Sequence, residues 1–412
     1  MKKIAIITPF LANGGLEKVA IVGAQELSKD FDVILVVMDT FHVDYPYDGK
    51  MIDLKVSLNN RNIFKRLLNI FKSTHKLRKL KKQQCFDLVI SHGELANLPN
   101  VFSGGKKNIL TVHENRFAAV KDTQGKFVNK IIKYIYSVKS VFKIITVSEG
   151  IRESFIENLK LDPRKIQTIY NPYDIDEITR LATEDLTDLS SLFSHKVLTI
   201  TGRLTLQKGQ WFLLRIFNQL KKLNPQFKLV ILGDGEIKDK LIALSNNLDL
   251  KTYSTWSDNK FDGDYDVYFM GFVKNPFKYV AQSKLFIMTS LWEGFGNTIV
   301  EAMACGTPVV ATACQSGPSE IINPNLGSAN KTEQPVYDGY GVLMPIFQRR
   351  FIGADIELDK QEKLWVKTID DLLSNEKQLQ YYTAKGLKRA RDFQVLPIMK
   401  QWKSLINSVL DT

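Results

Sequence analysis

Glu293 and Glu301, with seven residues between them, are the two acids whose spacing says most about chemistry. The surrounding pattern predicts a strand over 285–289, a loop, and a helix that begins near Asn297 and stops before Pro308. Asn297 is the expected N-cap, and the N–H groups behind it, with the positive end of the helix dipole, favour an anion. Glu301 would accept hydrogen bonds from a ribose, and the dipole favours its ionised form. These residue types indicate a site for a phosphorylated, hydroxyl-rich ligand.

Taken alone, the two acids also have an ordinary explanation, with Glu301 as a first-turn helix acid and Glu293 as a solvated loop acid. The whole string 293–310, however, resembles the acid-x7-acid signature of the retaining glycosyltransferases of the GT-B fold, family 4, and continues into Ala-Met-Ala-x-Gly-Thr-Pro-Val-Val as that family does. The resemblance implies a nucleotide-diphosphate sugar as co-substrate, with Glu301 on the ribose and Glu293 as a catalytic residue on the sugar hydroxyls. The donor-binding residues between the acids would be Phe295, Gly296, Asn297 and Thr298.

Two cations, Arg203 and Lys208, lie in a second predicted strand–loop–helix turn, after a strand over 197–201. The planar fork of arginine and the mobile charge of lysine can neutralise a diphosphate together, although a solvated loop is the alternative. The pair matches the family's Gly-Arg…Lys-Gly pattern, which favours donor binding. We expect no metal ion and no other cofactor, because no Asp-x-Asp follows a predicted strand and the two cations can replace a metal.

The N-terminal half supplies two further candidates. Gly15, in Gly14-Gly15-Leu16-Glu17, resembles the family's Gly-Gly-x-Glu signature, and glycine allows close backbone approach at a helix start that favours phosphate. A glycine pair alone is common in turns. His113 follows the predicted strand at 109–112 and aligns with the family's donor-sugar histidine, which implies a catalytic role in orienting the sugar and supporting charge at the reacting carbon. His92 is a weaker second candidate, and a lone histidine is more often structural.

Apolar, β-rich segments alternate with helix-period segments along the whole chain, which predicts an α/β protein with parallel sheets covered on both faces. We expect two doubly wound Rossmann-like domains: an acceptor-binding domain over 1–180 and a nucleotide-sugar-binding domain over 190–390. Residues 391–412 would form a helix that crosses back, as in the resembled family. Ligands of such sheets bind beyond the carboxyl ends of the strands, so the two GT-B domains would face a central cleft. The predicted strands are 4–8, 33–37, 88–91, 109–112, 144–147, 166–170, 197–201, 229–232, 267–270, 285–289 and 309–312.

Net charge, cysteine content and the lengths of the apolar runs indicate the partner and the cellular compartment to expect. The chain has 412 residues, a net charge of +12 and three cysteines, which favours an anionic partner and a reducing cytoplasm and offers no disulfide framework. The apolar run after Met1 is short and broken by Pro9, so we interpret it as a first strand rather than a secretion signal. No apolar run reaches the roughly 20 residues of a membrane span.

A basic segment over 61–82 contains no acid and has apolar residues at helical spacing. Basic amphipathic helices suit an anionic membrane surface, while nucleic acid or a solvated helix face are the alternatives. In the resembled family the N-terminal domain usually binds the acceptor, and many members act on lipid-linked sugars at a membrane. We therefore expect the protein to be peripheral, on the cytoplasmic face of the inner membrane. A second basic segment spans 126–143. The predicted membrane-binding residues are Lys65, Arg66, Lys72, Lys76, Arg78 and Lys79.

The resemblance spans nearly the whole chain, and together with these features it implies a retaining, metal-independent glycosyltransferase. It would move a hexose or N-acetylhexosamine from a UDP-sugar to a lipid-linked or polysaccharide acceptor in bacterial lipopolysaccharide or capsule synthesis. The alternatives are a sugar-nucleotide epimerase of the same fold, a nucleic-acid-binding protein and a non-catalytic membrane scaffold. Nucleic acid is the less favoured partner, because recognisable binding modules are absent. Two segments, 246–266 and 324–337, are additional to the pattern of the resembled family. They could cap the donor or contact a partner.

Overall fold

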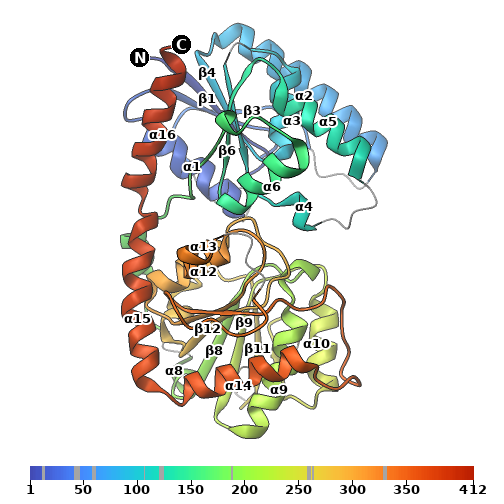
Figure 1. Cartoon of the computed structure of the whole chain (residues 1–412), viewed down its shortest axis with the longest axis vertical. Helices are drawn as coiled ribbons and strands as arrows, with labels where there is room; N and C mark the ends of the chain where they lie inside the picture. The colour runs from blue at the N-terminus through green and yellow to red at the C-terminus, as the bar shows by residue number, and fades with distance from the viewer. Residues whose placement is uncertain are drawn as a thin grey trace. The chain divides into compact units, whose positions relative to one another are not determined.

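The computed structural model describes the chain except residues 12–13, 41–46, 58–61, 106, 120–124, 187–188, 258–260, 262–263 and 328–331. The chain divides into two compact units (Figure 1). Unit 1 consists of Met1–Tyr173 and Phe393–Thr412, and unit 2 consists of Asp174–Asp392. Each unit is built on one seven-stranded parallel sheet, which confirms the predicted α/β class.

The sheet of unit 1 has the order β3-β2-β1-β4-β5-β6-β7. Its strands are mainly apolar because helices bury both faces. In β1, Ile4 and Ile6 enter a core shared with α1 and α16, whereas Ala5 and Ile7 enter a second core shared with α2 and α3. The elements are β1 (Lys3–Thr8), α1 (Gly15–Leu27), β2 (Asp32–Val37), β3 (Met51–Asp53), α2 (Ile63–Gln84), β4 (Leu88–His92), α3 (Glu94–Phe102), β5 (Asn108–Val112), α4 (Arg116–Ala119), α5 (Gly125–Ser137), β6 (Val141–Thr146), α6 (Glu149–Leu159), β7 (Ile166–Thr168) and α16 (Val395–Leu410).

The sheet of unit 2 has the order β10-β11-β9-β8-β12-β13-β14. Its larger core contains Trp211 from α9 and Trp365 from α14, both fully buried. The elements are α7 (Ile175–Ala182), α8 (Ser190–Phe193), β8 (Lys196–Thr201), α9 (Gln210–Leu223), β9 (Phe227–Leu232), α10 (Lys238–Asn247), β10 (Thr252–Ser254), β11 (Val267–Gly271), α11 (Phe277–Gln282), β12 (Leu285–Met288), α12 (Asn297–Ala304), β13 (Val309–Thr312), α13 (Pro318–Ile322), β14 (Val342–Met344), α14 (Lys360–Leu373) and α15 (Glu376–Ala390).

The last helix, α16, belongs to unit 1 although it ends the chain. It packs on α1 (Figure 1) and buries Ile398, Trp402 and Ile406 in the core behind β1. Lys107 Nζ donates to the carbonyl oxygens of Val409 and Leu410 at 2.8 and 3.0 Å. A cation at the carboxyl end of a helix complements its dipole and its unpaired carbonyls, so both packing and electrostatics fix α16 to this unit.

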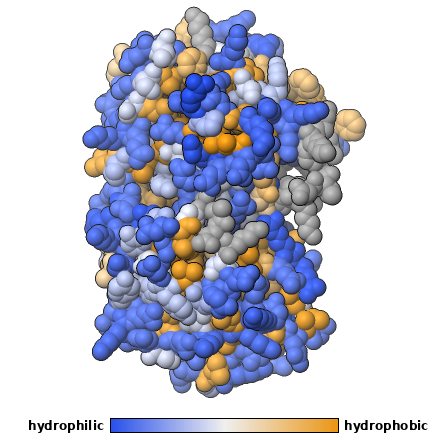
Figure 2. Space-filling model, viewed as in Figure 1, coloured by the Kyte–Doolittle hydropathy of each residue, from blue (hydrophilic) through white to orange (hydrophobic). Residues whose placement is uncertain are grey.

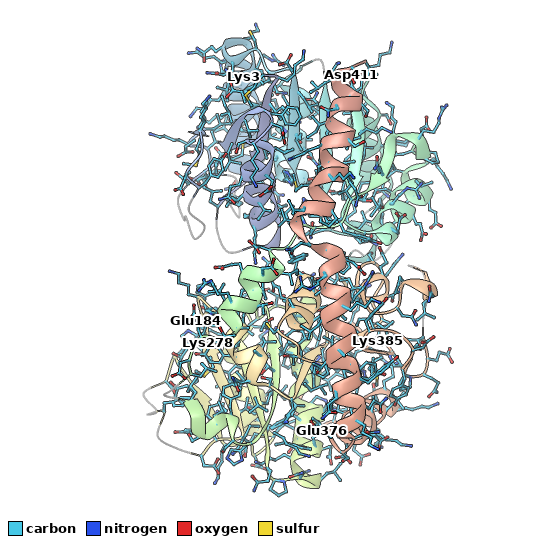
Figure 3. All side chains as sticks on the ribbon, turned by 90° about the vertical axis from the view of Figure 1, so that its left-hand side faces the viewer. Lys3, Glu184, Lys278, Glu376, Lys385 and Asp411 are labelled. Carbon is cyan, nitrogen blue, oxygen red and sulfur yellow. The ribbon has the colours of Figure 1, made fainter. Side chains whose placement is uncertain are left out.

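The boundary between the units falls at Asp174, before the expected 180, so α7 is part of unit 2. The reason is packing, because α7 contacts α11 and α12. The segment that follows α7 is also tied to α11 (Figure 3): Asn275 Nδ2 donates to Glu184 Oε2 at 2.8 Å, and Lys278 Nζ donates to the carbonyl oxygen of Asp185 at 3.1 Å.

The two additional segments, 246–266 and 324–337, both contribute to the sheet of unit 2. The first contributes β10, and Trp256 follows it with Lys238 Nζ 4.7 Å from its ring centroid. The second brings Val336 into an antiparallel bridge with Leu343 of β14. The face in Figure 2 is mainly hydrophilic, with hydrophobic side chains in separate patches. In the described part of the chain, no helix combines the length and apolarity needed to cross a membrane.

Candidate functional site

The candidate site of unit 2 lies where the chain reverses its direction of strand addition. From β8 the chain continues to β9 on one side of the sheet and later returns to β12 on the other. In parallel sheets the loops after two such strands diverge and leave room for a ligand at their carboxyl ends. The loop after β8 carries Arg203 and Lys208, and the loop after β12 carries Glu293.

Lys208 and Glu293 form an ion pair between these loops. Lys208 Nζ lies 2.5 Å from Glu293 Oε1, and the side chains are 18% and 7% exposed. Partial burial strengthens the attraction, and it also makes either charge costly once its partner is removed. The predicted phosphate-binding lysine and the predicted catalytic acid are therefore direct neighbours.

The loop backbones are held together independently of this pair. Thr289 Oγ1 donates to the carbonyl oxygen of Lys208 at 3.0 Å, and Leu291 N donates to that of Gln207 at 2.8 Å. Gly209 adopts φ +62°, and a Cβ there would overlap the carbonyl oxygen of Thr289. Glycine is required because the two backbones approach closely and the conformation is left-handed. The result is a fixed frame under the Lys208 ammonium.

Arg203 is the exposed cation of the site. Its carbonyl oxygen accepts from Gln210 Nε2 at 2.9 Å, so the backbone is anchored to the start of α9. Within the described residues its guanidinium makes no ion pair, unlike the ammonium of Lys208. A fixed backbone with a solvent-facing guanidinium is suited to an incoming anion.

Helix α12 begins at Asn297, as expected, but Asn297 is not the N-cap. Gly296 takes that position with φ +98°, and Asn297 is the first helical residue. Glycine reaches this left-handed conformation without strain, whereas the Cβ atom of asparagine makes the same conformation less favourable. Phe295 and Gly296 are buried, while Asn297 and Thr298 are half-buried at the helix start. Glu301, one turn further, is half-buried as well.

Cys314 was not singled out in the sequence, yet it belongs to the surroundings of Glu293. Burial, and secondly the negative charge of Glu293, raise the pKa of the Cys314 thiol. The thiol therefore stays protonated, and it acts as a neutral neighbour of Glu293 rather than as a nucleophile. Nothing in its sequence context signals this, since Cys314 follows β13 and Glu293 follows β12.

In unit 1, His113 lies directly after β5 and contacts a second histidine. Its Nε2 atom lies 3.1 Å from His92 Nδ1 and 3.0 Å from Thr111 Oγ1. Burial lowers the pKa of His92 to about 4, and burial followed by the neighbouring His92 lowers the pKa of His113. Both rings are thus neutral at physiological pH. The Thr111 contact was missed, although residues two apart on a strand share a face. Gly15 is the half-buried first residue of α1.

The structure thus gathers the predicted residues in two places. The carboxyl edge of the unit 2 sheet carries Arg203, Lys208, Glu293, Phe295, Gly296, Asn297, Thr298 and Glu301, and unit 1 carries Gly15 and His113. Across the ranges that the structure describes, no group of three or more His, Cys, Asp and Glu side chains is arranged to hold a metal ion.

The predicted membrane-binding residues all lie on α2, and four of its apolar side chains are exposed: Phe64, Leu67, Leu68 and Phe71. Two of the cations are used within the fold: Lys76 Nζ donates to the carbonyl oxygen of Leu54 at 2.7 Å, and Arg78 Nη2 donates to that of Phe102 at 2.8 Å. Arg61 of the first basic segment lies outside the described residues, as do the side chains of Lys126 and Phe127 in the second. The other four predicted cations, Lys65, Arg66, Lys72 and Lys79, are exposed as well.

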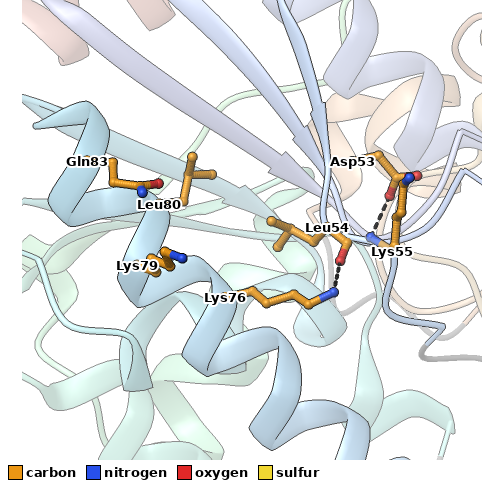
Figure 4. Close-up of a pocket in the computed structure, with 7 residues that line it drawn as sticks. All are labelled: Asp53, Leu54, Lys55, Lys76, Lys79, Leu80 and Gln83. Atoms are coloured by element: carbon orange, nitrogen blue, oxygen red, sulfur yellow. Dashed lines mark hydrogen bonds between the residues drawn. The ribbon is translucent and has the colours of Figure 1, made fainter.

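A hollow of about 310 Å³ opens between α2 and the loop after β3 (Figure 4). Three lysines line it, Lys55, Lys76 and Lys79, against one acid, Asp53. The Asp53 carboxylate is already bound by Thr40 Oγ1 at 2.6 Å and by the Lys55 backbone N–H at 2.7 Å. The hollow is therefore a positively charged extension of the α2 surface.

Comparison with known proteins agrees with this geometry. The profile described as Glycosyltransferase Family 4 matches residues 13–177, and that described as Glycosyl transferases group 1 matches residues 195–334. An uncharacterized glycosyltransferase of Methanocaldococcus jannaschii is 36% identical over 358 residues, which cover 83% of this chain and 84% of that protein.

Two further relatives extend the similarity over nearly the whole chain. The N-acetylgalactosamine-N,N'-diacetylbacillosaminyl-diphospho-undecaprenol 4-alpha-N-acetylgalactosaminyltransferase of Campylobacter jejuni is 26% identical over 408 residues, covering 97% of this chain and 98% of that one. The crystal structure of Anabaena Alr3699/HepE in complex with UDP and glucose superposes with a TM-score of 0.72 at 17% identity, over 99% of this chain and 100% of that chain. This second likeness shows the shared GT-B fold.

Proposed function

Because the chain belongs to glycosyltransferase family 4, we propose that it transfers a hexose or N-acetylhexosamine from a UDP-sugar to a lipid-linked or polysaccharide acceptor in bacterial cell-surface glycan synthesis. The transfer would retain the anomeric configuration and need no metal. The observation that carries this proposal is the contact between Lys208 and Glu293 at the point where the unit 2 sheet reverses direction. The cation that we propose for the diphosphate and the acid that we propose for the sugar hydroxyls are therefore neighbours.

The proposed chemistry follows from charge. In the transfer, the bond between the anomeric carbon and the diphosphate oxygen breaks, and the bond to the acceptor oxygen forms on the same face. The acceptor's proton passes to the leaving diphosphate. Negative charge develops on that diphosphate, where Arg203 and Lys208 would stabilise it without a metal ion. Glu301 would hold the ribose and Glu293 the sugar hydroxyls, while Phe295, Gly296, Asn297 and Thr298 would line the donor.

The proposed acceptor class has independent support. The name of the Campylobacter relative specifies a diphospho-undecaprenol acceptor, and the Anabaena structure contains UDP and glucose. For this chain, a lipid-linked acceptor also fits the exposed side chains of α2. Phe64 and Phe71 are 83% and 72% exposed, in contrast with the buried Leu77 and Leu80 of the same helix. A helix that only packed on the sheet would not need to expose such a face.

We therefore propose that α2 docks on the cytoplasmic face of an anionic membrane. Its exposed apolar side chains would enter the interface, while Lys65, Arg66, Lys72 and Lys79 would attract the headgroups at roughly 1 kcal/mol per cation. Nucleic acid is disfavoured as the partner because phosphate contacts do not require an exposed aliphatic and aromatic strip.

The test of the function is acceptor-dependent turnover in the presence of a chelator. The protein is incubated with UDP-glucose, UDP-galactose, UDP-N-acetylglucosamine or UDP-N-acetylgalactosamine, with and without a short-chain polyprenyl-diphosphate sugar. Product NMR then gives the anomeric configuration. UDP release that needs the acceptor and yields an α-linked product from an α-linked donor supports the proposal. Conversion of the nucleotide sugar without acceptor would instead establish the epimerase alternative, and inversion or a metal requirement would refute the mechanism.

A further inference from the structure

The hollow between α2 and the loop after β3 lies beside an exposed apolar strip on the same helix, made of Phe64, Leu67, Leu68 and Phe71. We propose that this hollow is a binding site for the phosphomonoester headgroup of a membrane lipid. The proposal rests on the membrane docking proposed for α2, and it adds to that docking a defined site and a class of lipid.

The lining of the hollow carries more positive than negative charge. Three ammonium groups, those of Lys55, Lys76 and Lys79, stand against the single carboxylate of Asp53. The sequence of α2 contains no acid that could compensate its two lysines from the same helix. The excess of two positive charges matches an anion that carries two negative charges.

The hollow is held in shape on both of its sides. Lys76 Nζ donates to the carbonyl oxygen of Leu54 at 2.7 Å, so this ammonium is fixed at the rim (Figure 4). In the described part of the chain that bond uses one of its three N–H groups and leaves two for a ligand. The Asp53 carboxylate accepts from Thr40 Oγ1 at 2.6 Å and from the Lys55 backbone N–H at 2.7 Å, which fixes the loop opposite.

The two lysines of α2 lie on the flank of the helix, beside the apolar strip. Successive residues of an α-helix are turned by about 100°, so the side chains of the strip centre on one line along α2. Lys76 and Lys79 are turned by about 100° from that line, toward the loop after β3. The buried Leu77 and Leu80 centre on the side opposite the strip. The hollow therefore opens between the exposed apolar side and the buried side of α2.

This position favours a lipid over a phosphate in solution. An amphipathic helix on a membrane lies in the plane of the interface, with its apolar face about 5–10 Å deep. A helix with its side chains is about 10–12 Å across, so its flank then lies at the depth of the headgroup phosphates. Lys76 and Lys79 are only about 8 and 12 Å beyond Phe71 along the axis, so a single docked lipid layer reaches both the strip and the hollow.

Charge and shape favour a phosphomonoester over a phosphodiester. A phosphomonoester has a second pKa near 6, so it carries nearly two negative charges above neutral pH and presents three free oxygens. A phosphodiester headgroup carries one charge and presents two. The Coulomb attraction to the three lysines grows with the charge of the anion, so the phosphomonoester gains more from this hollow.

The lipid preference is measured by co-sedimentation of the full chain with two kinds of vesicle. Both contain phosphatidylcholine with either phosphatidic acid or phosphatidylglycerol, and they are matched in zeta potential and buffered above neutral pH. We expect about fivefold tighter binding to phosphatidic acid. The double change Lys55→Gln and Lys79→Gln should abolish this preference and keep binding to phosphatidylglycerol. The matched control, Lys65→Gln with Lys82→Gln, removes two exposed charges of α2 outside the hollow and should weaken both bindings equally.

Equal binding to the two vesicles, or a preference that persists without Lys55 and Lys79, would overturn the site and leave the docking of α2 intact. Absence of binding to either vesicle would overturn both. Thermal unfolding of each variant confirms that it folds, as expected for substitutions at exposed positions.

The source of the phosphate is tested by calorimetric titration with glycerol 3-phosphate, a soluble phosphomonoester. We expect binding at least about tenfold weaker than to phosphatidic acid vesicles, because the apolar strip then contributes nothing. Equally tight binding that is lost in the Lys55→Gln and Lys79→Gln variant would assign the hollow to a free phosphate and overturn the lipid. Neither measurement uses a nucleotide sugar, so a protein that prefers phosphatidic acid but transfers no sugar would refute glycosyl transfer alone.

Discussion

Lys208 Nζ lies 2.5 Å from Glu293 Oε1, although the two residues are 85 positions apart in the chain. The ammonium that would bind the donor diphosphate is thus held by a carboxylate when no anion is present. Both side chains are largely buried, so each keeps the other's charge compensated. A diphosphate that binds Lys208 must compete with Glu293, which then becomes available to the sugar hydroxyls.

This competition predicts opposite effects on binding and turnover in Glu293→Gln. Without the carboxylate, Lys208 is released to the diphosphate, so UDP should bind at least as tightly as to wild type. Sugar transfer should fall about 100-fold or more, because the acid proposed to hold the sugar hydroxyls has lost its charge. Calorimetry with UDP and a turnover assay measure the two effects. Lys208→Met should instead weaken UDP binding, and the exposed Glu236→Gln should change neither. Weaker UDP binding in Glu293→Gln would contradict the competition.

A second ion pair is expected to control stability rather than activity. Arg215 Nε and Nη2 lie 2.6 and 3.1 Å from the Glu362 carboxylate oxygens, and the side chains are 1% and 0% exposed. The same guanidinium also donates to the carbonyl oxygens of Gly353, Ile356 and Glu357, which anchors the segment before α14.

Arg215→Met should therefore destabilise unit 2 by about 3–5 kcal/mol, because Glu362 is left as a buried, unpaired charge. Urea unfolding followed by tryptophan fluorescence measures this, since Trp211 and Trp365 lie in the same core. Adding Glu362→Gln to Arg215→Met should recover part of the loss. A destabilisation below about 1 kcal/mol, the size expected for a surface pair, would contradict the assigned burial.

The buried His92 predicts a pH dependence of stability. Its pKa is about 4 in the folded protein against 6.5 as the ordinary value, so the unfolded chain binds more protons between these two values. Stability linked to His92 is therefore complete above pH 6.5 and is lost as pH falls from 6.5 toward 4, by at most about 3 kcal/mol. Urea unfolding of wild type and His92→Phe over this range isolates the effect. The wild-type slope should be steeper, and equal slopes would show that His92 is protonated equally in both states.

Exposed apolar side chains on α2 predict membrane association. The double change Phe64→Ser and Phe71→Ser should reduce co-sedimentation with vesicles of mixed phosphatidylglycerol and phosphatidylethanolamine about tenfold or more, because each phenyl ring contributes apolar area at the interface. Leu396→Ser on α16, which is 70% exposed, is the matched control and should bind as wild type does. Equal binding by the double variant, or a preference for RNA over vesicles, would contradict the docking surface.

The sequence was most informative where strands are long and apolar. The eleven strands predicted from such segments are present, because burial on both faces leaves an uninterrupted hydrophobic run. β7 has only three residues but was predicted from the longer segment 166–170, whereas β3, β10 and β14, with three residues each, were not predicted. Their pairing depends on the neighbouring strands β2, β11 and β13.

The identity of the site residues stays a prediction, and the contacts between them were not foreseen from the sequence. Asn297 as N-cap was wrong, because the left-handed conformation that ends the loop favours Gly296. The Lys208–Glu293 pair could not be inferred, since it depends on the order of β8 and β12 in the sheet. The Thr111 contact could have been anticipated, because Thr111 precedes His113 by two positions at a strand end.

The most direct test of the central claim is calorimetric titration of UDP, GDP and ADP into wild type and Arg203→Ala, with a chelator present. The account predicts micromolar binding of UDP without metal, weakened about tenfold or more in Arg203→Ala, because a charge-assisted hydrogen bond to phosphate is lost. The exposed Arg350→Ala should bind as wild type does. Absence of nucleotide binding, or UDP binding that is indifferent to Arg203, would contradict the donor site.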